Sequence, residues 1–339
     1  MTDLMNEWQE FVTQRADTPS VAPSHEGFFA ALTEYGLIAA SGEEAANFLH
    51  NQLTNDVLTL AADNARLAGY CSPKGRLLAT MLTWRSGDDI MLMLPKQLQA
   101  AIQKRLQMYV LRAKVKLRDA SAEFAILGLA GAFDSATLAT YLPQSANVAY
   151  SKQETNTGNL IRLPDAAGVP RALWITPIAN AINAWPTLEQ TLRRAAATAW
   201  QLTEIEAGTP WITLPTQEKF VPQMINFEVV GGVNFKKGCY PGQEIVARSQ
   251  YLGKLKRRML LAKIGGTQAE AGMEVFSEAD PEQPCGMIVN AQTDANGDAD
   301  CLVEIKLAQA ESAAIHLGAA TGPTLRFLPL PYALPDGAD

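Results

Sequence analysis

The sequence contains few of the residues that build disulfide frameworks and metal sites. Its 339 residues include only four cysteines, Cys71, Cys239, Cys285 and Cys301, and only three histidines. The cysteines lie far apart and form no CxxC pair, so we expect neither a disulfide framework nor a structural zinc site. The spacing also cannot hold an iron-sulfur cluster on this chain alone, and we therefore expect no resident metal.

The sequence also lacks an apolar stretch long enough to cross a bilayer. Its longest apolar runs, such as residues 90–94, have the length of a strand. The first eleven residues, MTDLMNEWQEF, are acidic and amphipathic, and so lack the basic and apolar parts of a signal peptide. These features predict a cytoplasmic protein that does not contact a membrane.

Acidic residues outnumber basic ones, 35 to 28. The resulting net charge of -7 disfavours nonspecific binding of a polyanion over the whole surface. Two segments depart from this balance. The first, which we call the basic island, spans residues 236–263 and has Glu244 as its single acid. Its cations are Lys236, Lys237, Arg248, Lys254, Lys256, Arg257, Arg258 and Lys263.

The second segment, residues 111–118, alternates cations with apolar residues. This period of two predicts a strand that places Arg112, Lys114, Lys116 and Arg118 on one face. Such a face is a solvated strand surface whose cations discourage edge pairing, or it is a site for an oligoglutamate tail, a phosphate or RNA. The pattern alone leaves both interpretations open.

The order of predicted elements indicates an α+β protein. Residues 1–24 are predicted as an N-terminal extension, with one or two amphipathic turns and a Pro- and Ser-rich linker. Helices and strands then mix in a first unit at 25–120 and a second at 121–250. Residues 251–339 contain short strands between turns, which predict a small antiparallel β-barrel.

The segment from Lys237 to Arg258 combines a cysteine, turn residues and cations. Gly238 and Pro241-Gly242 predict tight turns, so Cys239 is expected on a bend. If the thiol is exposed, the neighbouring lysines lower its pKa and favour the reactive thiolate. The alternative is a buried cysteine that fills apolar space. His50, in a predicted helix at about 43–53, is interpreted as a packing or surface residue.

Seven motifs resemble the YgfZ family, and together they cover nearly the entire chain. They are KGCYPGQEIVAR, IEAG at Ile205–Gly208, KFVPQMINFEVVGGVNFKKG, FLHNQLTNDV, AGYCSPKGRLLA, KRLQMYVLRAKVKL and the terminal LPLPYAL. Around Cys239 the resemblance is carried by Lys237, Gly238, Tyr240, Gly242, Gln243, Glu244 and Arg248.

The resemblance implies a folate-binding protein that assists iron-sulfur cluster assembly or repair and tRNA modification. The family is similar to the T-protein of the glycine cleavage system, an aminomethyltransferase with a ring of three domains around tetrahydrofolate. The T-protein has an acidic pair after the loop that corresponds to CSPKGRLLAT. Here Ala79 and Thr80 stand at that point, and neither is an ionisable acid, so the transferase chemistry is expected to be absent or moved elsewhere.

The resemblance also implies which residues contact tetrahydrofolate or a derivative. A pterin calls for aromatic faces and a carboxylate that accepts paired hydrogen bonds. Tyr35 and Trp200 match the aromatic contacts, although the family has tryptophan at the first position, and Glu206 matches the pterin-binding glutamate. Both aromatics also fit a core role. We assign Arg112 and Lys114 to the glutamate tail on charge.

The leading hypothesis is a folate-binding, non-transferring protein with Cys239 as its functional thiol. The thiol's role is left open between a transient iron contact, thiol exchange and acceptance of a client's cluster. The expected partners are folate, iron-sulfur client enzymes or assembly factors, and tRNA. The alternatives are a folate-dependent one-carbon transferase that uses another base, and an RNA-binding adaptor that uses the basic island.

Overall fold

The protein divides into two compact units, each built from separate stretches of the chain. The first contains Met1–Phe48, Val57–Arg66 and Leu82–Thr203, and the second contains Leu49–Asp56, Leu67–Met81 and Glu204–Asp339. The computed structural model describes residues 2–15, 27–133, 136, 138–142, 148–251 and 255–335. The predicted linker and Lys254 lie outside the described residues.

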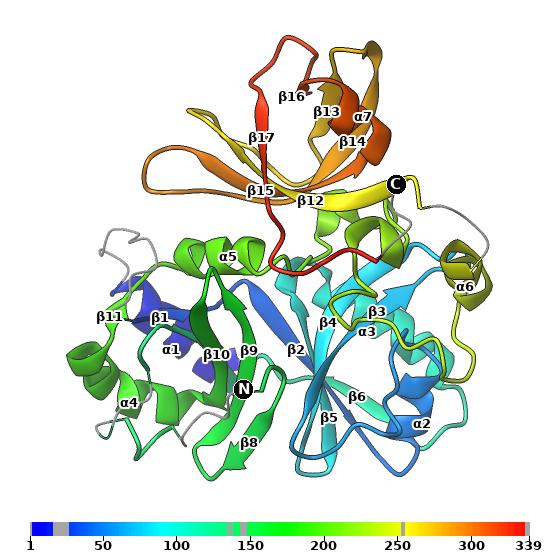
Figure 1. The fold of residues 1–339 in the computed structure, drawn as a ribbon. Coiled ribbons are helices and arrows are strands. Elements are labelled where there is room, and N and C mark those ends of the chain that lie inside the picture. Colours follow the sequence, from blue (N-terminus) through cyan, green and yellow to red (C-terminus); the bar gives the residue numbers. More distant parts are fainter. Residues whose placement is uncertain are drawn as a thin grey trace. The chain divides into compact units, whose positions relative to one another are not determined.

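A six-stranded sheet forms part of the first unit (Figure 1). Its pairs are antiparallel except for the parallel pair β1 and β11. In sheet order the strands are β11 (Arg193–Arg194), β1 (Phe28–Ala31), β7 (Phe124–Ala130), β10 (Val169–Pro177), β9 (Gly158–Ala166) and β8 (Lys152–Thr155).

Helices α1 (Thr2–Thr13) and α4 (Ile178–Thr191) pack together in this unit. The ring centroids of Trp8 and Trp185 lie 5.8 Å apart in an edge-to-face arrangement that stabilises aromatic pairs. The N-terminal segment is therefore a helix of 12 residues, longer than the predicted one or two turns, because its apolar face joins the core of the unit.

A second sheet has the order β3-β4-β5-β2-β6. Its strands are β3 (Ala65–Cys71), β4 (Leu77–Ser86), β5 (Asp89–Pro95), β2 (Tyr35–Ser41) and β6 (Lys116–Asp119), and the nearby helices are α2 (Ala45–His50) and α3 (Lys96–Val110). The predicted apolar stripe of α3, at Leu98, Ile102 and Leu106, is buried, which confirms that helix.

The predicted basic strand at residues 111–118 is wrong in its first half. Helix α3 extends to Val110, and Leu111 then adopts a positive φ of 48° that turns the chain. Regular pairing begins only at Lys116, so Arg112 and Lys114 precede the strand and do not share its face. The alternating pattern gave a wrong start for the strand because it did not show that the preceding helix ends only at Val110 and is followed by a turn.

The third sheet belongs to the second unit and is antiparallel throughout. It curls (Figure 1), and an isolated bridge between His316 and Thr324 links β16 to the residues before β17. Its strands, in sheet order, are β16 (Ile315–Leu317), β13 (Glu274–Ser277), β14 (Asp280–Thr293), β15 (Ala299–Lys306), β12 (Arg257–Ile264) and β17 (Leu325–Leu328).

The remaining helices are α5 (Ala197–Glu206), α6 (Gln243–Tyr251), α7 (Leu307–Ser312) and the short 3-10 helices η1 (Leu214–Thr216) and η2 (Pro222–Ile225). Helices mix with antiparallel sheets, and one of the sheets is a curled C-terminal one, so the predicted α+β class is confirmed. Among the described residues, no helix has both the length and the apolarity needed to cross a membrane.

Candidate functional site

Three segments that carry sequence motifs meet in the second unit, although they are far apart in the chain. Thr54 joins all three, because its backbone N–H donates to the Gly69 carbonyl at 2.8 Å and its hydroxyl donates to the Gly232 carbonyl at 2.6 Å. The Asn234 N–H in turn donates to the Thr54 carbonyl at 3.0 Å. Residues 49–56, 67–71 and 231–234 are therefore held side by side.

The loop at residues 236–242, which we call the cysteine loop, ends in the predicted Pro241-Gly242 turn. The Gln243 N–H donates to the Tyr240 carbonyl at 3.1 Å, and Gly242 has a φ of 80°, which together define a type II turn. A Cβ on Gly242 would lie 2.4 Å from the Ser72 carbonyl oxygen. The cysteine loop therefore packs against the SPKG turn at residues 72–75, and only glycine fits the contact.

Cys239 lies in irregular backbone of this loop, as predicted, and its side chain is exposed. The other three cysteines, all in the described part of the chain, are buried. Burial raises the pKa of the Cys71 and Cys301 thiols to about 12 and also raises the pKa of Cys285. Near neutral pH, Cys239 is therefore the cysteine available for reaction with a partner.

Lys237 points into the protein and not outward beside the thiol. Its ammonium donates to the carbonyls of His50 and Leu53, the latter at 2.7 Å, and lies 4.8 Å from the centre of the Tyr240 ring. Burial lowers the pKa of Lys237 to about 8, while Asp56 and Cys239 act in the opposite direction. Lys237 thus anchors the cysteine loop to residues 50–53.

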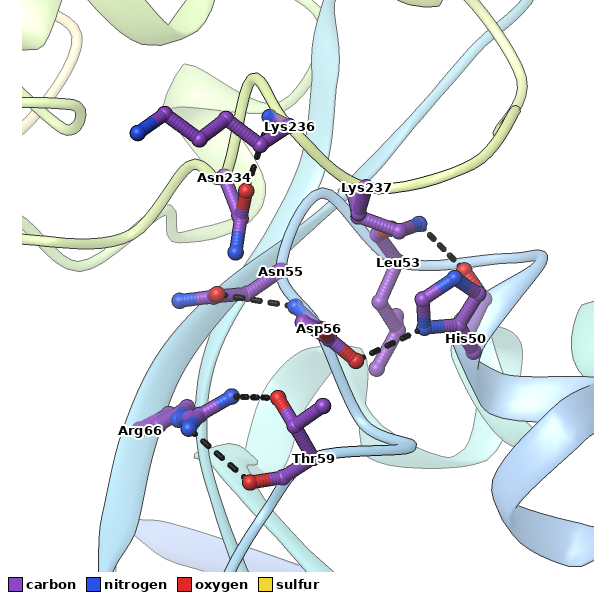
Figure 2. Close-up of polar contacts among 9 residues, drawn as sticks. All are labelled: His50, Leu53, Asn55, Asp56, Thr59, Arg66, Asn234, Lys236 and Lys237. Carbon is purple, nitrogen blue, oxygen red and sulfur yellow. Dashed lines mark hydrogen bonds and ion pairs between the residues drawn. The ribbon is translucent and has the colours of Figure 1, made fainter.

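His50 and Asp56 form a pair beside this anchor (Figure 2). The His50 Nδ1 atom lies 3.0 Å from the Asp56 carboxylate, and His50 is only 8% exposed. His50 is buried, as the packing interpretation allowed, but that interpretation did not include its contact with the distant cysteine loop. No local pattern places residues 50 and 56 against a loop that lies 180 residues further along the chain.

The basic island is not a continuous basic surface. Four of its cations are used inside the protein, because Lys237 is buried and three others form ion pairs with acids elsewhere in the unit. These pairs are Arg257 with Glu304, Arg258 with Glu228, and Lys263 with Asp294 and Asp300. Lys236, Arg248 and Lys256 are the exposed cations of the island among the described residues.

The two aromatic residues predicted to bind folate are buried in the first unit. Tyr35 lines a cavity of about 20 Å³, which has room for a single water molecule and is too small for a pterin. The Trp200 ring packs so closely on Gly128 that a Cβ there would lie 2.4 Å from it, and the Arg171 guanidinium lies 5.3 Å from its centre. These contacts are those of core residues.

The polar residues predicted for folate lie at more accessible positions. Glu206 ends helix α5 in the second unit and is half-buried. In the first unit, Arg112 is exposed, and the exposed Lys114 ammonium lies 2.8 Å from Glu43.

Ala79 and Thr80, which the sequence comparison places at the T-protein's acidic pair, are packed in the interior. Ala79 and Thr80 are both 0% exposed. The Thr80 hydroxyl donates to the Pro210 carbonyl at 3.2 Å and accepts from the Ile212 N–H at 2.9 Å, so its hydrogen bonds are internal. Among the described residues, no three His, Cys, Asp or Glu side chains gather closely enough to hold a metal ion.

The fold is that of the glycine cleavage T-protein. The structure is similar to that of the glycine cleavage system aminomethyltransferase T from Bartonella henselae, with a TM-score of 0.73 over 89% of this chain and 84% of that one. The sequences are 16% identical, so this likeness shows the fold alone. No protein-family model matches the chain.

Curated relatives define the family more closely. The chain is 31% identical over 253 residues to the tRNA-modifying protein YgfZ of Colwellia psychrerythraea. The aligned region covers 73% of this chain and 75% of the relative. It is 33% identical over 224 residues to the tRNA-modifying protein YgfZ of Edwardsiella ictaluri, 66% of either chain. The chain belongs to the YgfZ family.

Proposed function

We propose that this protein binds a reduced folate and uses Cys239 to help build or repair iron-sulfur clusters in client enzymes, including enzymes that modify tRNA. The observation that carries the proposal is the exposed thiol on a loop fixed by Lys237 and by the Gly242 turn. A side chain held out from rigid backbone suits an encounter with a partner protein. The tRNA-modifying relatives support the choice of clients.

The absence of transferase chemistry is part of the proposal. A general acid or base needs an ionisable group that reaches the substrate. Ala79 offers none, and the Thr80 hydroxyl is engaged by Pro210 and Ile212 in the interior. The T-protein fold can thus retain a folate site while it lacks the carboxylate that directs transfer.

The proposed folate contacts remain those that the family resemblance implies. Glu206 would accept hydrogen bonds from the pterin edge. The assignment of Tyr35 and Trp200 rests on the resemblance alone, because both rings are buried in the first unit. Arg112 and Lys114 would attract the anionic glutamate tail, and Lys114 would then exchange its pairing with Glu43. The buried Trp200 Nε1 has no hydrogen-bond partner among the described residues, which supports a polar neighbour at that ring.

Calorimetric titration with tetrahydrofolate tests the folate half of the proposal. We expect Cys239→Ala to bind within about twofold of the wild type, because the thiol serves the client and not the pterin. Glu206→Gln should bind at least about tenfold more weakly, since charge-assisted hydrogen bonds are worth roughly 1.5–3 kcal/mol. The matched control is Glu270→Gln, an exposed acid in the curled C-terminal part of the chain.

Three outcomes would count against this proposal. If neither tetrahydrofolate nor its polyglutamates gave a heat of binding, the proposed folate site would be ruled out. Turnover of a methylamine donor with tetrahydrofolate would instead identify a one-carbon transferase. Binding of tRNA that weakens steeply with added salt would favour the RNA-binding adaptor, although the exposed cations of the basic island are few.

A further inference from the structure

The His50 imidazole is held in one orientation by a carboxylate. Its Nδ1 atom lies 3.0 Å from Asp56 Oδ1, and the Asp56 backbone N–H donates to the Asn55 side chain at 2.8 Å (Figure 2). A carboxylate accepts hydrogen bonds only, so Nδ1 carries the proton and donates. In the neutral ring, Nε2 is then the atom with a free lone pair.

That lone pair faces the cysteine loop. Nε2 lies 3.6 Å from the position that a Cβ would occupy on Gly238, the residue directly before Cys239. Nε2 has no hydrogen-bond partner in the part of the chain that the structure describes. A side chain that is nine-tenths buried thus presents an unpaired acceptor to the segment that carries the exposed thiol.

The backbone holds the two sides together. The Lys237 ammonium donates to the carbonyl of His50 itself, so the residue that carries the imidazole is tied to the loop that carries the thiol. Gly238 supplies no side chain that would separate them. Asp56 pairs with the imidazole, and Lys237 donates to the His50 carbonyl. The Tyr240 ring faces the Lys237 ammonium, and burial raises the pKa of its hydroxyl so that it stays neutral. Cys239 follows Gly238 directly in the chain.

We propose that His50 is the base that deprotonates Cys239, and that Asp56 keeps the imidazole in its accepting tautomer. The assignment rests on the proposed role of Cys239 as the functional thiol. The S–H bond breaks and an Nε2–H bond forms, which leaves a thiolate beside an imidazolium that Asp56 stabilises. In exchange with a client disulfide, the thiolate bonds to one sulfur and the other sulfur leaves as a thiolate.

Alkylation with iodoacetamide measures the thiolate directly. The sulfur bonds to carbon and iodide leaves, and mass spectrometry of the Cys239 peptide gives the rate at each pH. The buried Cys71, Cys285 and Cys301 are shielded in the folded protein, and burial raises the pKa of each thiol. Neither folate nor a client protein takes part in this reaction. The assay therefore tests the role of His50 separately from the proposed function.

We expect His50→Gln to react about tenfold more slowly than the wild type near pH 6.5, and to match it near pH 10, where the thiol ionises without help. Asp56→Asn should shift the profile in the same direction by a smaller factor. The matched control is His316→Gln, which removes a second buried histidine paired with a carboxylate, Glu278, at 3.0 Å. Its profile should equal that of the wild type.

A wild-type profile in His50→Gln at every pH would overturn the assignment. A second measurement decides the case if that variant fails to fold. At fixed pH, Cys239→Ser should move the nitrogen NMR signal of His50 Nε2, because the thiol that shares a proton with that atom is gone. An unchanged signal would show that the two groups do not share a proton.

Discussion

Gly242→Ala should destabilise the second unit by on the order of 4 kcal/mol and release the cysteine loop. Gly242 has a φ of 80°, which an alanine adopts at a cost of about 1–2 kcal/mol. The added Cβ would also lie 2.4 Å from the Ser72 carbonyl oxygen and 2.6 Å from the Gly75 nitrogen. Both obstacles are backbone atoms of a tight turn, so the strands behind them must shift.

Denaturant unfolding followed by circular dichroism measures this loss. Gly231→Ala is the matched control, because Gly231 has a similar φ of 83° but would place its Cβ in open space. It should lose only the conformational part, about 1 kcal/mol. Equal losses in the two variants would show that the contact between the two turns does not hold the cysteine loop.

Lys237→Met should cost on the order of 3 kcal/mol at neutral pH, although it removes a buried charge. The carbonyls of His50 and Leu53 lose their donor, and each unsatisfied buried carbonyl costs roughly 1–3 kcal/mol. The contact between the ammonium and the Tyr240 ring is lost as well. Methionine keeps the length of the side chain and so limits the cavity.

The cost of Lys237→Met should grow with pH. The folded-state pKa of Lys237 is lowered from 10.5 to about 8, so between these values the unfolded chain binds more protons than the folded one. Stability contributed by this residue therefore rises from about pH 8 to 10.5, by about 2 kcal/mol, and the methionine variant lacks that gain.

Lys236→Met separates this effect from a general loss of charge. Lys236 is the adjacent residue and is exposed. Its variant should follow the wild type across the same pH range, whereas the difference between Lys237→Met and the wild type widens. A constant difference would mean that Lys237 does not titrate within the folded site.

Local signals in the sequence predicted the elements that depend on neighbouring residues. The stripe of α3 and the Pro241-Gly242 turn follow from spacing and backbone preference over a few residues. The same signals predicted that Cys239 lies outside a helix or strand, but they left its exposure open, and the structure places it at the surface. These helices and turns form as predicted because contacts with distant segments do not change their backbone conformation.

Features that depend on distant partners were missed. Strand β1 pairs with β7 and β11, segments about 100 and 165 residues away. Three cations of the basic island, Arg257, Arg258 and Lys263, pair with acids that no local charge pattern connects to them. The His50–Asp56 pair meets the cysteine loop only after the chain has folded.

The exposed thiol of Cys239 is proposed to serve the clusters of other proteins. The direct measurement is the iron and sulfide content of a tRNA-modifying iron-sulfur enzyme purified from cells that carry the wild type, Cys239→Ala, the exposed control Glu270→Gln, or no copy of this protein. We expect Cys239→Ala to match the cells without the protein, and Glu270→Gln to match the wild type. Full clusters in the client from Cys239→Ala cells would contradict the account.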